Sequence, residues 1–191
     1  MEDIPQHVNA FLLHSACGSV TFFNEAELQH ELGFWLRTRM PPGTHVCFER
    51  PASHFFASAR GLVKKEIDLV VSPPDRSWYY AIELKCPRNG RIPETMFDAL
   101  RDLQMLEQLT LAGFVGGLFV MHVDDPGFHK TGIKTGIYSH FRSGVPITGR
   151  VIKPTEPKDE AVDIRGEYTV RWQSYGSAGQ YWIQQVTGTQ L

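Results

Sequence analysis

The segment FVGGLFVMHV, residues 114–123, constrains the fold more than any other stretch of the 191-residue chain. It is almost continuously apolar, yet far shorter than the ~20 apolar residues that a membrane-spanning helix needs. A short run of this composition is typical of a β-strand that is buried on both faces. We therefore expect a sheet that other elements cover on both sides.

Helices are predicted before and between the strands. The first begins after Asn24, which is a good N-cap residue. Its apolar residues recur at helical spacing: Leu28, Leu32, Trp35 and Leu36. A second helix carries a similar stripe and ends near Gly113. Residues 1–22 are compatible with a short helix or with a strand.

The remaining pattern completes an α/β domain. Further strands are expected at 45–50, 66–71 and 79–85. Residues 124–160 are rich in Gly, Pro and charge and are expected to form a loop excursion, and residues 166–187 a terminal β-hairpin. No linker divides the chain, so residues 1–191 are predicted to form one domain with a central mixed β-sheet flanked by helices.

The net charge and the cysteine pattern limit which functions and which cellular compartment we expect. The net charge of −2 argues against a protein that coats nucleic acid non-specifically, because such affinity comes mainly from phosphate neutralisation. The three cysteines are scattered and form no CxxC pair, which favours a reducing compartment. The N-terminus shows no basic segment followed by an apolar run. We expect a cytoplasmic protein without a membrane segment.

Two predicted strands carry charged residues within apolar runs. Strand side chains alternate between faces, so Glu83 and Lys85 project on the same side, about 7 Å apart. The turn between the two strands is long enough for Asp68 to meet Glu83 across the pair. In the plainer interpretation, Asp68 and Glu83 simply lie near strand ends and Lys85 forms a surface ion pair.

Such a group of side chains suits a hard divalent cation and a phosphate. Two carboxylates that lie together repel each other unless positive charge separates them. The simplest solution is Mg²⁺, for which Mn²⁺ can substitute, held by Asp68 and Glu83 with several waters retained. Lys85 can then bind a phosphate oxygen or orient an attacking water. The pattern indicates phosphodiester hydrolysis.

The pattern EIDLVV…AIELK resembles the PD-(D/E)xK nuclease superfamily, whose fold is restriction-endonuclease-like. In this resemblance Asp68 matches the metal-binding aspartate, Glu83 the second acid and Lys85 the lysine. Ile67 stands where many members have proline, and other members also lack that proline. The core motifs span residues 24–123, and with the late YTVRWQSYG they are similar to a group of bacterial proteins of undefined role.

The resemblance implies a metal-dependent nuclease that cuts nucleic acid, with DNA expected over RNA. The superfamily usually adds a glutamate from an N-terminal helix. At about 100° per residue, Glu25 lies close to the apolar stripe of the first helix and faces the sheet. Glu27 points nearly opposite and Glu31 lies at the flank, so Glu25 is predicted to join the site.

Some superfamily members also direct a polar residue of the second helix at the active site. Asp102 and Gln104 correspond to that position. Leu103 marks the core side of the helix, so Gln104 is expected at the border of the core and is the predicted site residue. Members that cut both strands of a duplex often act as dimers, so a homodimer is compatible with the resemblance.

Other features leave alternatives open. Basic residues precede the first charged strand and follow the second, and they are either solvated or at one cleft rim: Arg60, Lys64, Lys65, Lys85, Arg88 and Arg91. Cys86 has no evident His partner and is interpreted as a packing residue. Neither an HExxH pair nor a P-loop occurs. A non-catalytic nucleic-acid-binding or protein-interaction module and a hydrolase of small phosphorylated molecules remain alternative functions.

Overall fold

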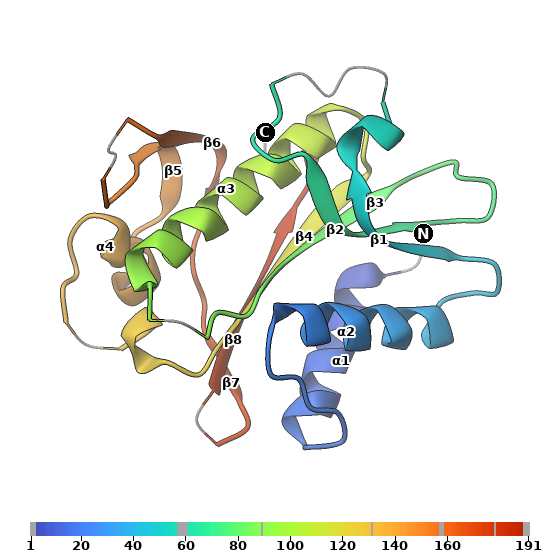
Figure 1. The fold of residues 1–191 in the computed structure, drawn as a ribbon, viewed down its shortest axis with the longest axis horizontal. Helices are drawn as coiled ribbons and strands as arrows, with labels where there is room; N and C mark the ends of the chain where they lie inside the picture. The colour runs from blue at the N-terminus through green and yellow to red at the C-terminus, as the bar shows by residue number, and fades with distance from the viewer. Residues whose placement is uncertain are drawn as a thin grey trace.

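A six-stranded mixed sheet forms the centre of the protein (Figure 1). The structure, a computed structural model, describes residues 3–56, 61–88, 90–130, 132–156, 159–177 and 179–188. The strands follow each other across the sheet as β1 (His45–Pro51), β2 (Glu66–Ser72), β3 (Tyr80–Lys85), β4 (Gly116–Val123), β8 (Gly179–Val186) and β7 (Gln173–Tyr175). The neighbours β3 and β4 run parallel, and the other neighbouring pairs are antiparallel.

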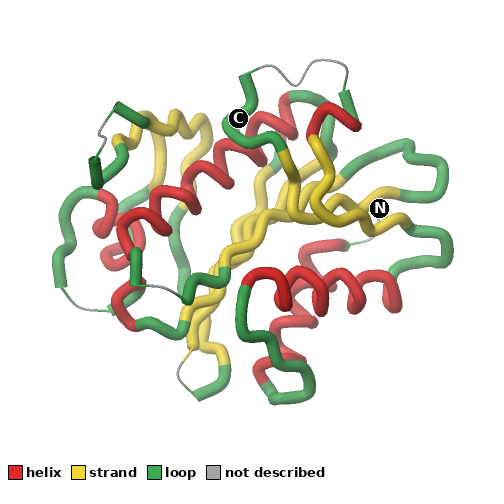
Figure 2. Tube along the Cα trace, viewed as in Figure 1, coloured by secondary structure: helices red, strands yellow, loops and turns green. Residues whose placement is uncertain are grey.

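Both faces of this sheet are covered, as Figures 1 and 2 show. One face packs against α1 (Ile4–Ala16) and α2 (Glu25–Arg39). The other face packs against α3 (Ile92–Leu111), α4 (Ile137–Ser143) and a second sheet made of β5 (Ile147–Ile152) and β6 (Ala161–Tyr168). Two 3-10 turns, Ala52–His54 and Pro126–Phe128, lie in the connections. The predicted α/β architecture with a mixed sheet flanked by helices is confirmed.

The central strand β4 explains why the fold needs two covering layers. All residues of β4 are buried, as its apolar composition predicts. Gly117 lets α3 approach closely, because a Cβ atom there would lie 2.8 Å from Cδ2 of Leu106. This close packing fixes α3 across the sheet, which sets where its polar side chains can reach.

The start of α2 is fixed by its sequence. The Asn24 side chain caps the helix by accepting a hydrogen bond from the Glu27 N–H at 2.9 Å. The Glu27 carboxylate in turn accepts from the Phe23 N–H at 2.6 Å. Together these contacts hold the first turn of α2, and with it Glu25, at the end of the sheet where β3 finishes. The predicted helix start is confirmed.

Several predicted elements differ from the structure. The segment 1–22, for which the sequence allowed either a helix or a strand, contains the helix α1. Asp3 caps this helix by accepting a hydrogen bond from the Gln6 N–H at 3.1 Å. The prediction of a loop excursion at 124–160 is wrong, because α4 and β5 form there. These elements bury Ile137, Phe141 and Ile147 against the core beside α3. Tertiary packing, more than local propensity, stabilises such short elements.

The terminal hairpin is shorter than predicted. Residues 173–175 and 179–186 do pair as antiparallel strands. Residues up to Tyr168, however, belong to β6, which pairs with β5 in the second sheet. The reason is that buried and exposed side chains alternate along β6. Its apolar face is therefore buried against α3.

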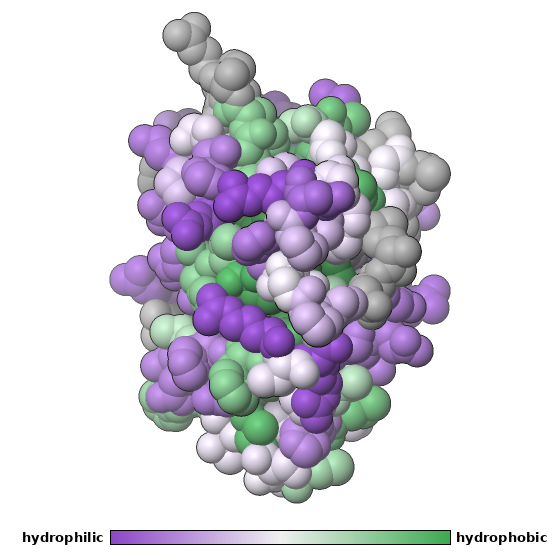
Figure 3. All heavy atoms as spheres, turned by 90° about the vertical axis from the view of Figure 1, so that its right-hand side faces the viewer, coloured by the Kyte–Doolittle hydropathy of each residue, from purple (hydrophilic) through white to green (hydrophobic). Residues whose placement is uncertain are grey.

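The edge strand β1 lies on the side of the molecule that faces the viewer in Figure 3, where hydrophilic residues are interspersed with hydrophobic ones. The Arg37 guanidinium donates a hydrogen bond to the Val46 carbonyl at 2.8 Å and lies over the Phe48 ring. A charged side chain over an edge strand, such as Arg37 here, hinders that strand from pairing with strands of other chains. Among the described residues, no helix combines the length and the apolar character that crossing a bilayer requires.

Candidate active site

Asp68 and Glu83 face each other across neighbouring strands. In the antiparallel pair of β2 and β3, Leu69 lies opposite Ile82. One further step of this register places Asp68 opposite Glu83 on the face that α3 covers. The Asp68 carboxylate is oriented by the backbone, because its Oδ2 accepts a hydrogen bond from the Leu84 N–H at 2.7 Å. The Glu83 side chain is fully buried.

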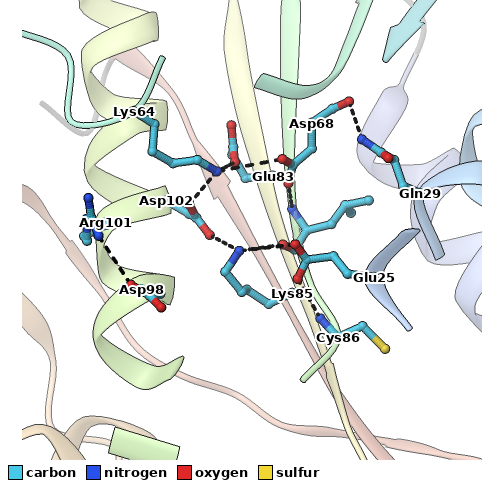
Figure 4. A network of polar contacts seen from close by, with 11 residues as sticks. Glu25, Gln29, Lys64, Asp68, Glu83, Lys85, Cys86, Asp98, Arg101 and Asp102 are labelled. Atoms are coloured by element: carbon cyan, nitrogen blue, oxygen red, sulfur yellow. Dashed lines mark hydrogen bonds and ion pairs between the residues drawn. The ribbon is translucent and has the colours of Figure 1, made fainter. Parts of the chain in front are cut away.

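Lys85 lies on the same face as Glu83, two residues further along β3. Its Nζ is 2.9 Å from Oδ2 of Asp102 on α3 and 3.6 Å from Oε1 of Glu25 on α2. It also donates to the Leu84 carbonyl at 3.1 Å. Lys85 therefore joins three elements, β3, α2 and α3, at one end of the sheet (Figure 4).

Glu25 reaches the site from the first turn of α2. Its Oε2 accepts a hydrogen bond from the Cys86 N–H at 3.2 Å. One turn further along the helix, the Gln29 side chain donates to the Asp68 carbonyl at 2.8 Å. The structure thus brings the predicted residues Glu25, Asp68, Glu83 and Lys85 together, and α2 is tied to both charged strands.

Lys64, which the sequence pattern placed only among the possible rim charges, lies at the centre of the group. Its Nζ is 2.5 Å from Oε2 of Glu83, 2.8 Å from Oδ1 of Asp102 and 3.8 Å from Oδ1 of Asp68. The only available signal was its position four residues before Asp68. Of the other basic residues that precede the first charged strand, Lys65 is exposed and Arg60 lies outside the described residues.

Asp102, rather than the predicted Gln104, is the α3 residue at this site. The Asp102 side chain is 2% exposed and contacts both lysines. Two residues along a helix are separated by about 200°, so Gln104 points away from the site. Within the described chain it forms no hydrogen bond or ion pair with these acids and lysines. The inference from Leu103 failed because α3 is buried around most of its circumference.

The charges of the site are unbalanced. Four carboxylates, from Glu25, Asp68, Glu83 and Asp102, surround the ammonium groups of Lys64 and Lys85. Burial raises the pKa of Glu83 well above its ordinary value, and the neighbouring Asp68 and Asp102 carboxylates raise it further. Burial also raises the pKa values of Asp68 and Glu25. The site therefore attracts additional positive charge.

The two lysines keep their protons despite being partly buried. Burial alone lowers a lysine pKa, but for Lys64 the Glu83, Asp102 and Asp68 carboxylates reverse this effect and raise the pKa above its ordinary value. For Lys85, the carboxylates of Asp102 and Glu25 likewise outweigh the effect of burial on the pKa. Both side chains are therefore cations at neutral pH.

A solvent-open cavity lies beside the group, next to both lysines and Asp102. Its volume is about 170 Å³, and five side chains line it: Lys64, Lys85, Asp98, Arg101 and Asp102. Arg101 is paired with Asp98 at 3.5 Å on the exposed side of α3. Three cationic and two acidic side chains therefore line the cavity.

The acids of this group that could hold a divalent cation are Asp68 and Glu83. Within the described ranges, no three side chains of the His, Cys, Asp and Glu types come together as a complete metal site. Mg²⁺, however, commonly uses one or two carboxylates together with water and substrate oxygens. The opposed pair of acids supplies that number, and Oε1 of Glu83 is buried without a hydrogen-bond partner. An unsatisfied buried carboxylate oxygen is costly unless a cation or proton binds it.

Cys86 does have a histidine partner, contrary to the sequence interpretation. Its Sγ lies 3.7 Å from Nδ1 of His122, whose Nε2 lies 3.4 Å from Oδ1 of Asp124. Burial raises the pKa of the Cys86 thiol to about 11 and lowers the pKa of His122 to about 4. The thiol therefore stays protonated at neutral pH, unlike an activated nucleophile. Cys86 remains a packing residue.

Comparison with known proteins does not extend these observations. Searches against protein-family models, curated proteins and solved structures find no match to this chain.

Proposed function

We propose that the protein is a metal-dependent nuclease with a restriction-endonuclease-like fold, and that it hydrolyses phosphodiester bonds, with DNA as the expected substrate. The observation that supports this most is the meeting of Asp68 and Glu83 across β2 and β3, with Lys85 beside them and Glu25 entering from α2. Of these residues Lys85 lines an open cavity, together with its partner Asp102.

In this proposal the two strand acids hold the metal, and Lys85 contacts the phosphate or the attacking water. When bound by Asp68 and Glu83, Mg²⁺ would act as a Lewis acid and would lower the pKa of a bound water. Lys85 Nζ orients the attacking water or contacts a phosphate oxygen, and Asp102 holds Lys85 in place at 2.9 Å. Arg101, which also lines the cavity, binds the adjacent backbone phosphate of the substrate.

In this proposal Glu25 is the proton acceptor beside Lys85. Its Oε1 lies 3.6 Å from Lys85 Nζ, while its Oε2 is held by the Cys86 N–H. A carboxylate in this position, with a pKa raised by burial, can accept a proton from a water that Lys85 orients. The fixed start of α2 therefore matters for catalysis as well as for folding.

The direct test is cleavage by the purified protein. Single-stranded and duplex DNA and RNA are incubated with Mg²⁺ or Mn²⁺, with EDTA as the metal-free control. We expect cleavage that requires the metal and falls by at least about 10²-fold in Asp68→Ala and Lys85→Ala. Asp163→Ala, an exposed change in β6, is the matched control. Full cleavage in either site variant would remove the proposed site.

One observation favours a second function, a non-catalytic nucleic-acid-binding module that retains the fold. Lys64 already lies 2.5 Å from Glu83, so the strand acids have a counter-ion within the protein. For such a module we expect nucleic-acid binding that is indifferent to divalent cations. Calorimetry with Mg²⁺ and thermal unfolding with and without Mg²⁺ distinguish the two functions, because ligand binding to the folded state raises stability.

A further inference from the structure

The ammonium of Lys64 lies between the acids that the proposed function assigns to a metal ion. It is closest to Glu83, at 2.5 Å, and lies 3.8 Å from Asp68 on the opposite strand. Figure 4 shows the Lys64 side chain extending from the loop before β2 across to both acids and to Asp102. A divalent cation shared by Asp68 and Glu83 would have to take this space.

The two lysines of the site differ in the contacts that a metal would disturb. Lys85 Nζ contacts Asp102 and Glu25, and it donates to a backbone carbonyl of its own strand. Lys64 contacts the two strand acids directly. If Lys64 withdrew, Asp102 would keep Lys85 at 2.9 Å, whereas Glu83 would lose its nearest cation. Entry of a metal therefore conflicts with Lys64 and leaves Lys85 in place.

Lys64 also has a route out of the site. Its side chain is 25% exposed and lines the open cavity of about 170 Å³. The loop that carries it is anchored independently, because the Val63 N–H donates to Gln108 at 3.0 Å and the Gln108 amide donates to the Gly61 carbonyl at 3.2 Å. The flexible lysine chain can therefore swing into the cavity while the loop backbone stays in place.

We propose that Lys64 occupies the divalent-cation position in the metal-free protein, so that its ammonium and the metal ion compete for Glu83 and Asp68. Lys64 then sets the concentration of metal at which the divalent cation binds. Until the cation binds, the Lys64 ammonium is the positive charge beside Glu83 and Asp68. The inference rests on the proposed function for the presence of a metal site, and it adds a residue that controls how tightly the metal binds.

The first test compares metal affinity in two neighbouring lysine variants. Mg²⁺ and Mn²⁺ are titrated by calorimetry, without nucleic acid, into the wild-type protein, Lys64→Met and Lys65→Met. Lys65 is exposed and outside the carboxylate group, so it is the matched control. We expect Lys64→Met to bind metal at least about tenfold more tightly than wild type, because the competing charge is gone. Lys65→Met should bind as wild type does.

The outcomes separate this inference from the proposed function. Equal or weaker binding by Lys64→Met, with clear binding by wild type, would overturn the competition and leave the nuclease proposal standing. Binding by Lys64→Met alone would support the competition but contradict a metal-dependent activity of the natural chain. Absence of binding in both proteins would overturn both proposals.

A second measurement needs no variant and therefore does not depend on how Lys64→Met folds. The wild-type protein is treated briefly with an amine-acylating reagent, and modification of each lysine is followed by peptide mass spectrometry. In EDTA we expect Lys64 to react at least about tenfold more slowly than exposed Lys65, because its side chain is only 25% exposed and its ammonium lies against Glu83 and Asp102. Saturating Mn²⁺ should accelerate Lys64 several-fold and leave Lys65 unchanged. An unchanged Lys64 rate would contradict displacement by the metal.

Discussion

Asp102 holds Lys85 in place from the helix that packs across the sheet, with Oδ2 of the acid 2.9 Å from Nζ of the lysine. The opposite oxygen of the same carboxylate lies 2.8 Å from Nζ of Lys64. One nearly buried acid on α3 therefore positions both cations of a site whose other acids come from β2, β3 and α2. A change at this acid should reach both lysines at once.

Replacing Asp102 should disable the site more than replacing its neighbour on the helix. We expect Asp102→Asn to lower the cleavage rate by about 10–100-fold, because both lysines lose a charged partner and Lys85 loses its fixed position. Its substrate KM should change less than its kcat, since Asp102 acts through Lys85. Gln104→Ala is the control and should cleave within about twofold of wild type. Equal losses in both variants would contradict the assignment of Asp102.

Glu25 should matter for cleavage without mattering much for folding. We expect Glu25→Gln to lower the cleavage rate by about tenfold or more, because the amide cannot accept a proton from water beside Lys85. The hydrogen bond from the Cys86 N–H is retained in this variant, so the melting temperature should change little. Glu31→Gln, at the flank of the same helix, should leave the rate unchanged. Steady-state cleavage and thermal unfolding of both variants check this prediction.

Glu83 should make a contribution to the stability of the metal-free protein that falls as the pH rises, whereas His122, whose pKa burial lowers to about 4, contributes with the opposite sign below pH 6.5. The pKa of Glu83 is raised in the folded state, so folded protein retains a proton that unfolded protein releases above the ordinary value of 4.5. The stabilising contribution is complete below pH 4.5 and is lost as the pH rises through the raised pKa. Urea unfolding in EDTA between about pH 4.5 and 8 measures this slope.

Two variants isolate the contribution of Glu83 to that slope. Glu83→Gln carries no titrating group at this position, so relative to wild type its stability should lack the part that falls with rising pH. The raised pKa values of Asp68 and Glu25 still contribute in that falling direction in both proteins. Glu167→Gln, exposed on β6, should follow the wild-type profile. A Glu83→Gln profile parallel to wild type would show that the buried carboxyl titrates normally.

The Cys86 thiol should be slow to alkylate at neutral pH. Burial raises its pKa to about 11, so the reactive thiolate is scarce until strongly alkaline pH. We expect iodoacetamide to modify exposed Cys17 at about pH 7–8 while Cys86 stays largely unmodified. Peptide mass spectrometry measures both rates. Rapid labelling of Cys86 at neutral pH would revive it as a candidate nucleophile with His122.

Local periodicity in the sequence is enough to assign several side chains of the site. Side chains alternate along a strand, so the spacing of Glu83 and Lys85 assigns both to one face, where Asp68 can meet them across the strand pair. The spacing of Leu28 and Leu32 oriented the first helix and selected Glu25 among its acids. These inferences depend on near neighbours in the chain, and the structure places all four residues together.

Tertiary structure alone decided which residues complete the site. Lys64 reaches Glu83 because the loop before β2 is anchored on α3 through Gln108, a contact between residues far apart in the chain. Asp102, and not Gln104, lies at the site because α4 and β6 also pack against α3, so the helix has no single apolar face from which its orientation could be read. Periodicity carries no information about such long-range packing, whereas the local side-chain direction of a strand or helix is set by the backbone itself.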